Sequence, residues 1–239
     1  MVSSGFAAKG TLLTFYNQPV LELTNIGIPV ATADDVDITN HDSAFDYEEF
    51  VPGILRGGDF EVEGNYLPTD DGQKDILDAL QARTYKTCQI IGPAGKYTFT
   101  FSAYPKKFAP TAPVEGKTSV SIGFKVSGKS TLTATTSTGF TTPFFALRDN
   151  GGNAVTPSPA AATAVYQYAA TLDSTDTHVA IQPHASDATS VFVNGTEVTS
   201  GNWSSDIAVA AGTTKQITVV VNDTGKASKV YRIFVERPV

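Results

Sequence analysis

Apolar and polar residues alternate along much of the chain, and this alternation predicts short β-strands. Tyr97, Phe99 and Phe101, for example, fall on one side of an extended segment over residues 97–104. The other strands expected in the first half cover residues 11–16, 20–23, 33–39, 58–67, 87–91 and 117–126, with a turn at Asn17-Gln18-Pro19. The pattern predicts a mainly β fold.

One segment has the period of a helix. Ile76, Leu77 and Leu80 form a narrow apolar stripe, and either Asp70 or Asp71 can cap the N-terminus. We expect one short amphipathic helix over residues 71–84, with its stripe buried against a sheet.

The second half of the chain contains only strand signals. Ser127 to Gly139 is rich in serine, threonine and glycine, which predicts a last strand that fades into a flexible connector. Beyond it, strands are expected over residues 165–172, 178–182, 190–193, 197–198, 207–210, 215–221 and 228–236. Asn194-Gly195 is a strong hairpin signal, because both central positions of such a turn favour positive φ. About seven short strands in about 100 residues are typical of an immunoglobulin-like sandwich. We therefore expect two domains, residues 1–138 and 139–239.

Composition and charge narrow the possible functions. The 239 residues are 41% hydrophobic and have a net charge of −7, which opposes sequence-independent binding to nucleic acid. Cys88 is the single cysteine, so no intrachain disulfide can form, and its neighbours predict a buried strand. Residues 1–10 lack the pattern of a signal peptide, and we expect no secretion signal.

Residues 36–53 combine acids, a histidine and aromatic residues, which makes them a candidate catalytic or metal site. His41 has no nearby histidine or cysteine, and the acids lack the order of a calcium loop. The nucleophile and phosphate-loop motifs are also absent from the sequence. We therefore expect no enzyme activity, no metal and no cofactor. Phe45, Tyr47 and Phe50 instead suit an interface, where aromatic side chains become buried.

Acids also alternate along two predicted strands in this region. Between Asp34 and Glu63 there are ten acids against Arg56 as the one arginine or lysine. If residues 33–39 pair with residues 58–67, one sheet face has five carboxylates without interspersed lysine, which is unfavourable between neighbouring strands. These carboxylates belong to Asp35, Asp37, Asp59, Glu61 and Glu63.

The stretch DVDITNHDSAFDYEEFVPGILRGGDFEVEGNYL, followed by a short helix and the strands YTFTFSAYP and KTSVSIGFKVSG, resembles the major tail tube protein of long-tailed, siphovirus-type bacteriophages. The shared order is an aspartate-bearing strand, a long loop that ends in Pro-Gly, and a strand with alternating acids. The resemblance covers about residues 5–135. It implies a β-sandwich or barrel-type tube domain that forms stacked, usually hexameric rings. Such a protein is made in the host cytoplasm and resides in the virion.

The resemblance also implies partners and site residues. Other copies of the chain, tail-tip proteins and tail-terminator proteins would bind it, while DNA and the tape measure protein would pass through the ring. The five carboxylates named above would line the lumen. Residues 40–55 would form an assembly loop that contacts neighbouring subunits through Asp42, Phe45, Asp46, Tyr47, Glu48, Glu49, Phe50 and Val51.

The stretches PHASDATSVFVNGTEVTSG, IAVAAGTTKQITVVVND and SKVYRIFVERP resemble cadherin-like or bacterial immunoglobulin-like sandwiches. This resemblance implies a domain displayed on the outside of the tube, with weak adhesion to host glycans as one role and passive decoration as another. Three alternatives stay open. They are a two-domain bacterial surface adhesin or carbohydrate-binding protein, the tube protein of a contractile injection system, and a glycan hydrolase with an appended module.

Overall fold

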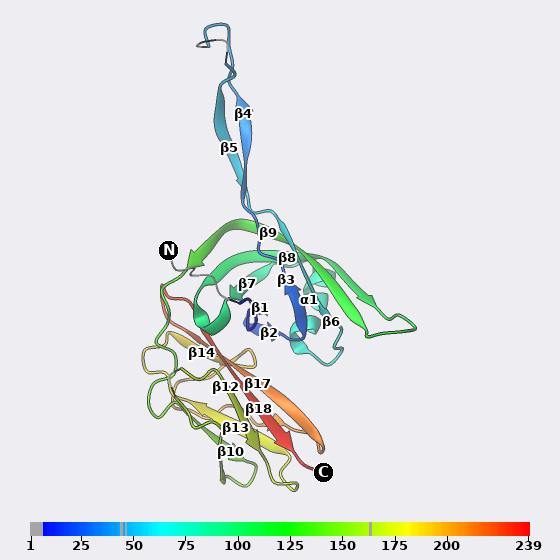
Figure 1. Ribbon diagram of the computed structural model, residues 1–239, viewed down its shortest axis with the longest axis vertical. Coiled ribbons are helices and arrows are strands. Elements are labelled where there is room, and N and C mark those ends of the chain that lie inside the picture. The colour runs from blue at the N-terminus through cyan, green and yellow to red at the C-terminus, as the bar shows by residue number, and fades with distance from the viewer. Residues whose placement is uncertain (1–6, 44, 46, 163) are drawn as a thin grey trace. The chain divides into compact units, whose positions relative to one another are not determined.

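The fold was analysed in a computed structural model, which describes residues 7–43, 45, 47–162 and 164–239. It is mainly β, with one α-helix in the described ranges, as the sequence predicts. The chain forms two compact units (Figure 1). Unit 1 comprises residues 1–20, 89–99 and 132–239, and unit 2 comprises residues 21–88 and 100–131. The domain boundary at residues 138–139 remains a prediction.

The strands form four sheets. The order β2-β1-β7-β8-β9-β6-β3 defines a seven-stranded sheet, and β4 and β5 form a separate pair. The bounds of the elements in these two sheets, with the α-helix, are β1 Leu12–Phe15, β2 Gln18–Val20, β3 Leu23–Ile26, β4 Thr32–Asp37, β5 Phe50–Arg56, β6 Asp59–Asn65, α1 Asp71–Ala82, β7 Lys86–Ile91, β8 Thr98–Thr111 and β9 Ser119–Thr133. No helix in the described ranges is long and apolar enough to span a membrane.

The core of unit 2 follows from the alternation along β6 and β9. In their antiparallel register, Phe60 lies opposite Phe124 and Val62 opposite Ile122, and all four side chains are buried. The Phe60 ring stacks on Phe124 at 4.8 Å between centroids and meets the edge of Phe101 at 5.2 Å. One face of this strand pair is therefore apolar and covered, which leaves the acids of β6 on the other face.

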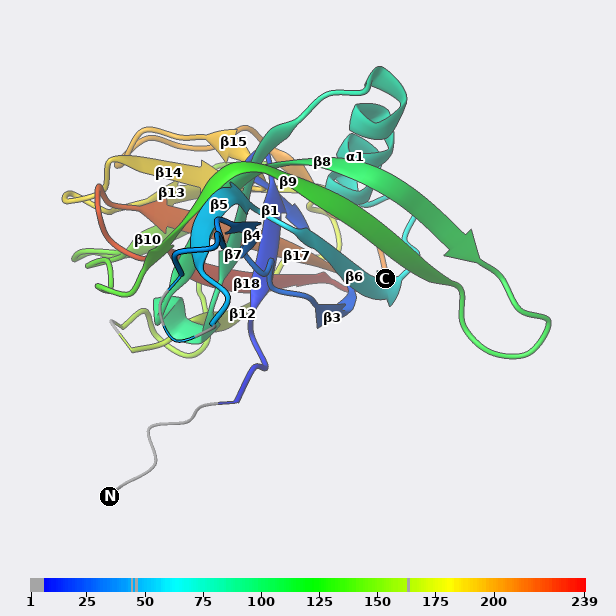
Figure 2. The ribbon, with the colours of Figure 1, turned by 90° about the horizontal axis from the view of Figure 1, so that it is seen from above.

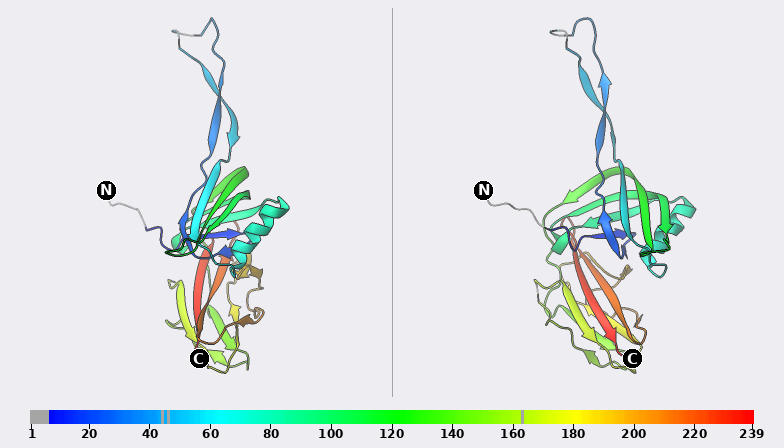
Figure 3. Two further views of the ribbon diagram at one scale, coloured as in Figure 1. Left: turned by 90° about the vertical axis from the view of Figure 1, so that its right-hand side faces the viewer. Right: turned by 45° about the vertical axis from the view of Figure 1, so that its right-hand side comes forward.

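Helix α1 lies beside the strands of unit 2 (Figures 2 and 3). Asp70 is its N-cap, because its carboxylate accepts a hydrogen bond from the Gln73 backbone N–H at 2.8 Å. The buried stripe consists of Gly72, Gln73, Ile76 and Ala79. Leu77 and Leu80, which the sequence pattern placed at the centre of the stripe, are only partly buried. The reason is that the Gln73 side chain turns inward, where its amide donates to the Asn65 carbonyl at 3.0 Å.

The C-terminal strands of unit 1 form a sandwich of two sheets. One sheet has the order β11-β10-β13-β16 and the other β12-β18-β17-β14-β15. Their bounds are β10 Phe145–Asp149, β11 Ala154–Val155, β12 Gln167–Thr171, β13 His178–Pro183, β14 Ser190–Val193, β15 Thr196–Glu197, β16 Ile207–Ala208, β17 Thr213–Asn222 and β18 Lys229–Arg237. Asn194 and Gly195 have φ values of 46° and 81°, which confirms the predicted hairpin turn.

The long pair β17–β18 is buried on both of its faces. Ile217, Val219 and Ile233 point into the sandwich core and have no exposed surface. On the opposite face, Val220 and Val230 pack against Leu12 and Ile91. Residues from β1 and β7 therefore cover the outer face of the sandwich within unit 1.

Two local predictions are wrong. The first turn falls at Tyr16 and Asn17, both with positive φ, instead of Asn17-Gln18-Pro19, because Gln18 already pairs with Phe15. The segment predicted as a flexible connector is largely ordered, since β9 continues to Thr133 and Ser137 is buried. Threonine is β-branched and favours strands, and this preference outweighs the loop-like composition.

Candidate assembly surface

A two-stranded arm is the most distinctive feature of unit 2. It consists of the antiparallel strands β4 and β5, with residues 38–49 as its tip. In Figures 1 and 3 the arm stands away from the other strands of the same unit. Val36 pairs with Val51 and Asp37 with Phe50. The predicted assembly loop 40–55 is therefore wrong in part, because residues 50–55 belong to a strand.

Both faces of the arm are exposed although much of its side-chain surface is apolar. The most exposed large hydrophobic residues of the arm are Phe45 at 90%, Leu55 at 77%, Tyr47 at 74% and Ile54 at 72%. Val36, Ile38, Phe50 and Val51 are also exposed. Exposed large apolar side chains that gather on one element make it a candidate interaction surface. An isolated two-stranded hairpin is also marginally stable in water.

Polar contacts shape the arm at both ends. Near its base, Arg56 forms an ion pair with Asp34 at 2.6 Å, and this contact lowers the pKa of the Asp34 carboxyl. Next to the tip, hydrogen bonding from the Thr39 side chain, and then from the Thr39 backbone N–H at 2.8 Å, lowers the pKa of the Asp37 carboxyl. Ser43 donates to the Glu49 carboxylate at 3.1 Å.

The remaining predicted assembly residues lie at the tip. Asp42 and Glu48 are exposed there and Glu49 is half-buried, whereas Asp46 lies outside the described residues. Sequence reasoning missed Ile54 and Leu55, although both lie in an apolar run directly after Pro52-Gly53.

The face with five carboxylates does not form. Strand β4 pairs with β5, and β6 pairs with β3 and β9, so Asp35 and Asp37 lie on the arm and share no sheet with the acids of β6. Residues 38–49 connect β4 to β5 and allow β5 to fold back antiparallel on β4, so β4 takes the next strand along the chain as its partner and not β6.

Two of the three exposed acids of β6, Asp59 and Glu61, have lysine partners, contrary to the sequence prediction. Asp59 lies 2.9 Å from both Lys106 and Lys125, and these contacts lower its pKa. Glu61 lies 3.9 Å from Lys107. Lys125 could have been found in the sequence, since it alternates with the buried Phe124 and Val126. The exposed face of β6 is therefore a mixed-charge face, which we define by Asp59, Glu61, Glu63, Lys106, Lys107 and Lys125.

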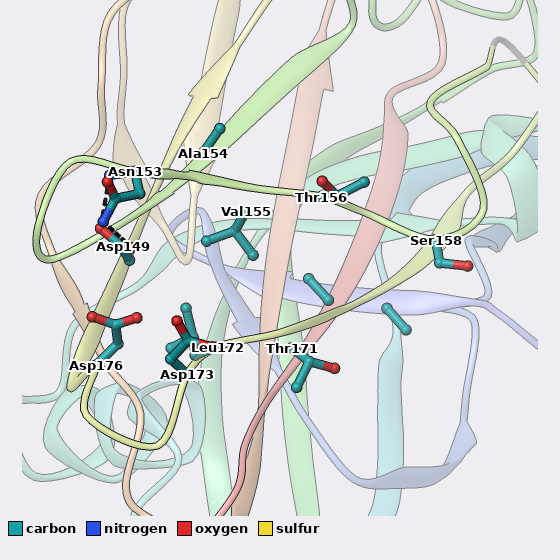
Figure 4. A pocket seen from close by; sticks show the side chains of 12 residues that line it. Asp149, Asn153, Ala154, Val155, Thr156, Ser158, Thr171, Leu172, Asp173 and Asp176 are labelled. Carbon is teal, nitrogen blue, oxygen red and sulfur yellow. Dashed lines mark hydrogen bonds between the residues drawn. The ribbon is translucent and has the colours of Figure 1, made fainter.

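A cavity of about 470 Å³ in the sandwich brings three aspartates together (Figure 4). Asp149 is buried, and its carboxylate accepts two hydrogen bonds from Asn153, at 2.8 and 2.9 Å, which lower its pKa. Asp173 and Asp176 lie on the loop after β12. No group of three potential metal-binding side chains is close enough to hold an ion within the ranges that the structure describes. The hydrogen bonds to Asp149 indicate a structural role in the β10–β11 turn.

Cys88 is fully buried in β7, as the sequence predicts, and burial raises the pKa of its thiol to about 12. Its thiol is therefore protonated at neutral pH and is a poor nucleophile.

Residues 153–238 match the family of cadherin-like beta sandwich domains. The C-terminal part of the chain is therefore a cadherin-like sandwich, in agreement with the fold class expected from its strands. No curated protein matches the sequence of the chain.

Several solved structures are similar to part of the chain. A chain from the virion of a native gene transfer agent is 15% identical, with a TM-score of 0.48 over 54% of this chain and 100% of that one. A chain from the sheath–tube complex of the PVC extracellular contractile injection system is 11% identical, with a TM-score of 0.46 over 56% and 94%. The SPP1 tail tube protein is 18% identical, with a TM-score of 0.42 over 54% and 78%. At these values the matches do not establish a shared fold.

Proposed function

We propose that this chain is a structural subunit of a phage-type tail tube, built from stacked rings of identical copies. The observation on which this proposal rests is the arm, which exposes apolar side chains on both faces. In the ring or stack, the arm lies against a neighbouring copy and buries Phe45, Tyr47, Ile54 and Leu55. Full burial of one large apolar side chain contributes about 1.5–3 kcal/mol, so several of them per subunit support a stable assembly.

The sequence resemblance supplies the class of assembly. The similar solved structures come from a gene transfer agent, a contractile injection system and the SPP1 tail tube. The proposal does not rest on them. The class includes tubes of long-tailed phages and of contractile injection systems. The cadherin-like sandwich is displayed on the outside of the tube in this proposal, and its role is decoration or weak adhesion.

The mixed-charge face lines the passage of the tube in this proposal. Its acids are exposed, which is consistent with a wall that faces water and DNA. The lysine contacts change the expected mechanism, because each paired lysine is less available to bind phosphate. Pairing of Lys106 and Lys125 with Asp59 thus keeps DNA from adhering. Asp35 and Asp37 are left out of this role because they lie on the arm.

Negative-stain electron microscopy of the concentrated protein tests the assembly. The wild-type chain is expected to form rings or tubes, and the triple variant Phe45→Ser, Tyr47→Ser, Phe50→Ser is expected to stay monomeric. Val114→Ser is the matched control, because Val114 is fully exposed in the same unit but outside the arm. Wild-type monomers at every concentration, or tubes from the triple variant, would contradict the proposal.

A charge-reversal variant tests the passage separately. Asp59→Lys, Glu61→Lys, Glu63→Lys is expected to form tubes that retain DNA, measured by DNA recovery after sedimentation. Tubes of this variant that retain no more DNA than the wild type would remove the mixed-charge face from the passage.

A further inference from the structure

A second cavity in unit 1, of about 440 Å³, has a basic lining. It lies where residues 9–10 and 93–94 meet residues 164–167 and strand β18. Lys9 and Arg232 contribute positive charge to the lining, and none of the described lining residues has a carboxylate. The parallel pairing of β12 with β18 places Gln167 beside Arg232, and Tyr166, the residue before Gln167, also lines the cavity.

Arg232 differs from Arg56 and Arg237 in the partners of its guanidinium. Arg56 is paired with Asp34, and Arg237 donates to the carbonyls of Ser174 and Val209 at distances of 2.9–3.2 Å. Arg232 makes one long hydrogen bond, from Nη2 to the Gly10 carbonyl at 3.3 Å. No carboxylate of the described residues forms an ion pair with it.

This arginine is also withdrawn from water. Partial burial lowers the pKa of Arg232, with no opposing contribution from a nearby acid. A guanidinium nevertheless stays charged at any physiological pH, so it cannot escape desolvation by losing its proton. A partly desolvated charge with no ionic partner is unfavourable, and an anion in the cavity reduces that cost.

One more cation lies near the aromatic part of the lining, although it is not a lining residue itself. The Lys229 ammonium lies 5.9 Å from the centre of the Tyr166 ring and donates to the Thr138 carbonyl at 3.1 Å, and the Asp223 carboxylate offsets part of its charge. Tyr166 is held in place by stacking on Tyr231, at 5.5 Å between centroids. The cavity thus has a fixed aromatic wall with cations beside it.

We propose that this cavity binds a carboxylate group, with Arg232 as its principal partner and Lys9 as an additional cation. A carboxylate matches the planar fork of the guanidinium and can accept two parallel hydrogen bonds from it. The volume lies within the range of small-molecule sites. The carboxylate comes either from a free small molecule or from an acidic side chain of another copy, since the arm tip exposes Asp42 and Glu48. A small-molecule ligand at this site is independent of the proposed tube role, whereas a carboxylate from the arm of another copy rests on it.

Isothermal titration calorimetry of the full chain tests this site with malonate, inorganic phosphate and a peptide of residues 40–49 as probes. Wild-type protein is expected to bind malonate more tightly than phosphate. Arg232→Gln is expected to weaken this binding at least about tenfold, because it removes charged hydrogen bonds. Arg237→Gln is the matched control on the same strand and is expected to bind malonate like the wild type. Peptide binding tighter than malonate binding assigns the carboxylate to another copy, and the reverse assigns it to a small molecule.

Three results would overturn the proposal: no binding of malonate or peptide to the wild type, tighter binding of phosphate, or unchanged binding to Arg232→Gln. A rise in the wild-type Tm with malonate concentration gives a test that needs no variant, since a ligand of the native state stabilises it. A Tm that is equally high in chloride of the same ionic strength would contradict a specific site.

Discussion

The strand pairs β4–β5 and β17–β18 are both antiparallel hairpins with large apolar side chains, yet their surroundings are opposite. In β17–β18 the inner face packs in the sandwich and the outer face packs on Leu12 and Ile91. In β4–β5 nearly every residue is exposed on both faces. The comparison teaches that alternating apolar residues specify a strand without specifying what covers it. In one case the cover lies in the same chain, and in the other we propose that it lies in another copy.

Truncating one side chain in each strand pair is expected to give the largest difference in unfolding free energy. Ile233→Ala is expected to lower the free energy of unfolding by about 2–5 kcal/mol, because it leaves a cavity in the sandwich core. Leu55→Ala is expected to change the unfolding free energy of the monomer by less than about 0.5 kcal/mol, because Leu55 is exposed. Denaturant unfolding of both variants at monomeric concentration measures the difference. Equal losses of stability would show that the arm is covered within its own chain.

Removing the N-cap of helix α1, which lies in the same unit as the arm, is expected to cause a smaller loss of stability. Asp70→Ala is expected to cost about 1 kcal/mol, because it removes the N-cap of α1. The same carboxylate also accepts a hydrogen bond from the Leu21 backbone N–H at 3.4 Å. Asp71→Ala is the control, since Asp71 is exposed and forms only a surface ion pair with Lys74. If Asp70→Ala loses no more stability than Asp71→Ala, the hydrogen bonds of Asp70 do not stabilise unit 2.

A substitution in the mixed-charge face is expected to have the smallest effect on stability. The pKa of Asp59 is lowered by Lys125 and Lys106, so its stabilising contribution is present above the unfolded pKa of about 4 and is lost as the pH falls through the folded value. The Tm of the wild type should therefore fall slightly more than that of Asp59→Asn between pH 5 and pH 3. Because the pair is exposed, 0.5 M salt should reduce this difference. Identical pH profiles for the two proteins would mean that the lysine contacts contribute nothing to stability.

Much of the fold could be predicted from the sequence where a pattern has one physical meaning. Alternation with β-branched residues identifies β14 and β17, and Asn194-Gly195 defines the hairpin between β14 and β15. Strands β10 and β11 were missed, because β10 mixes apolar residues with Arg148 and Asp149 and β11 has only two residues. The composition of residues 127–133 predicted the start of a connector, but these residues belong to the long strand β9.

The candidate surface was only partly predictable. The aromatic residues of the arm are visible in the sequence as unexplained apolar groups among acids, but strand pairing is a long-range property. The expected five-carboxylate face required β4 to pair with β6, and sequence alternation alone cannot decide between partners. The lysines that contact Asp59 and Glu61 come from β8 and β9, more than 40 residues away along the chain.

Hydrogen exchange of the monomer and of the assembled protein tests the central claim most directly, because it reports on both strand pairs in one experiment. Amides of β4 and β5 should exchange fast in the monomer and at least about tenfold more slowly after assembly, since an isolated hairpin is marginally stable and a covered one is protected. Amides of β17 and β18 should be protected equally in both states. If the arm exchanges at the same rate in the monomer and in the assembly, the arm is not the surface through which copies of this chain associate.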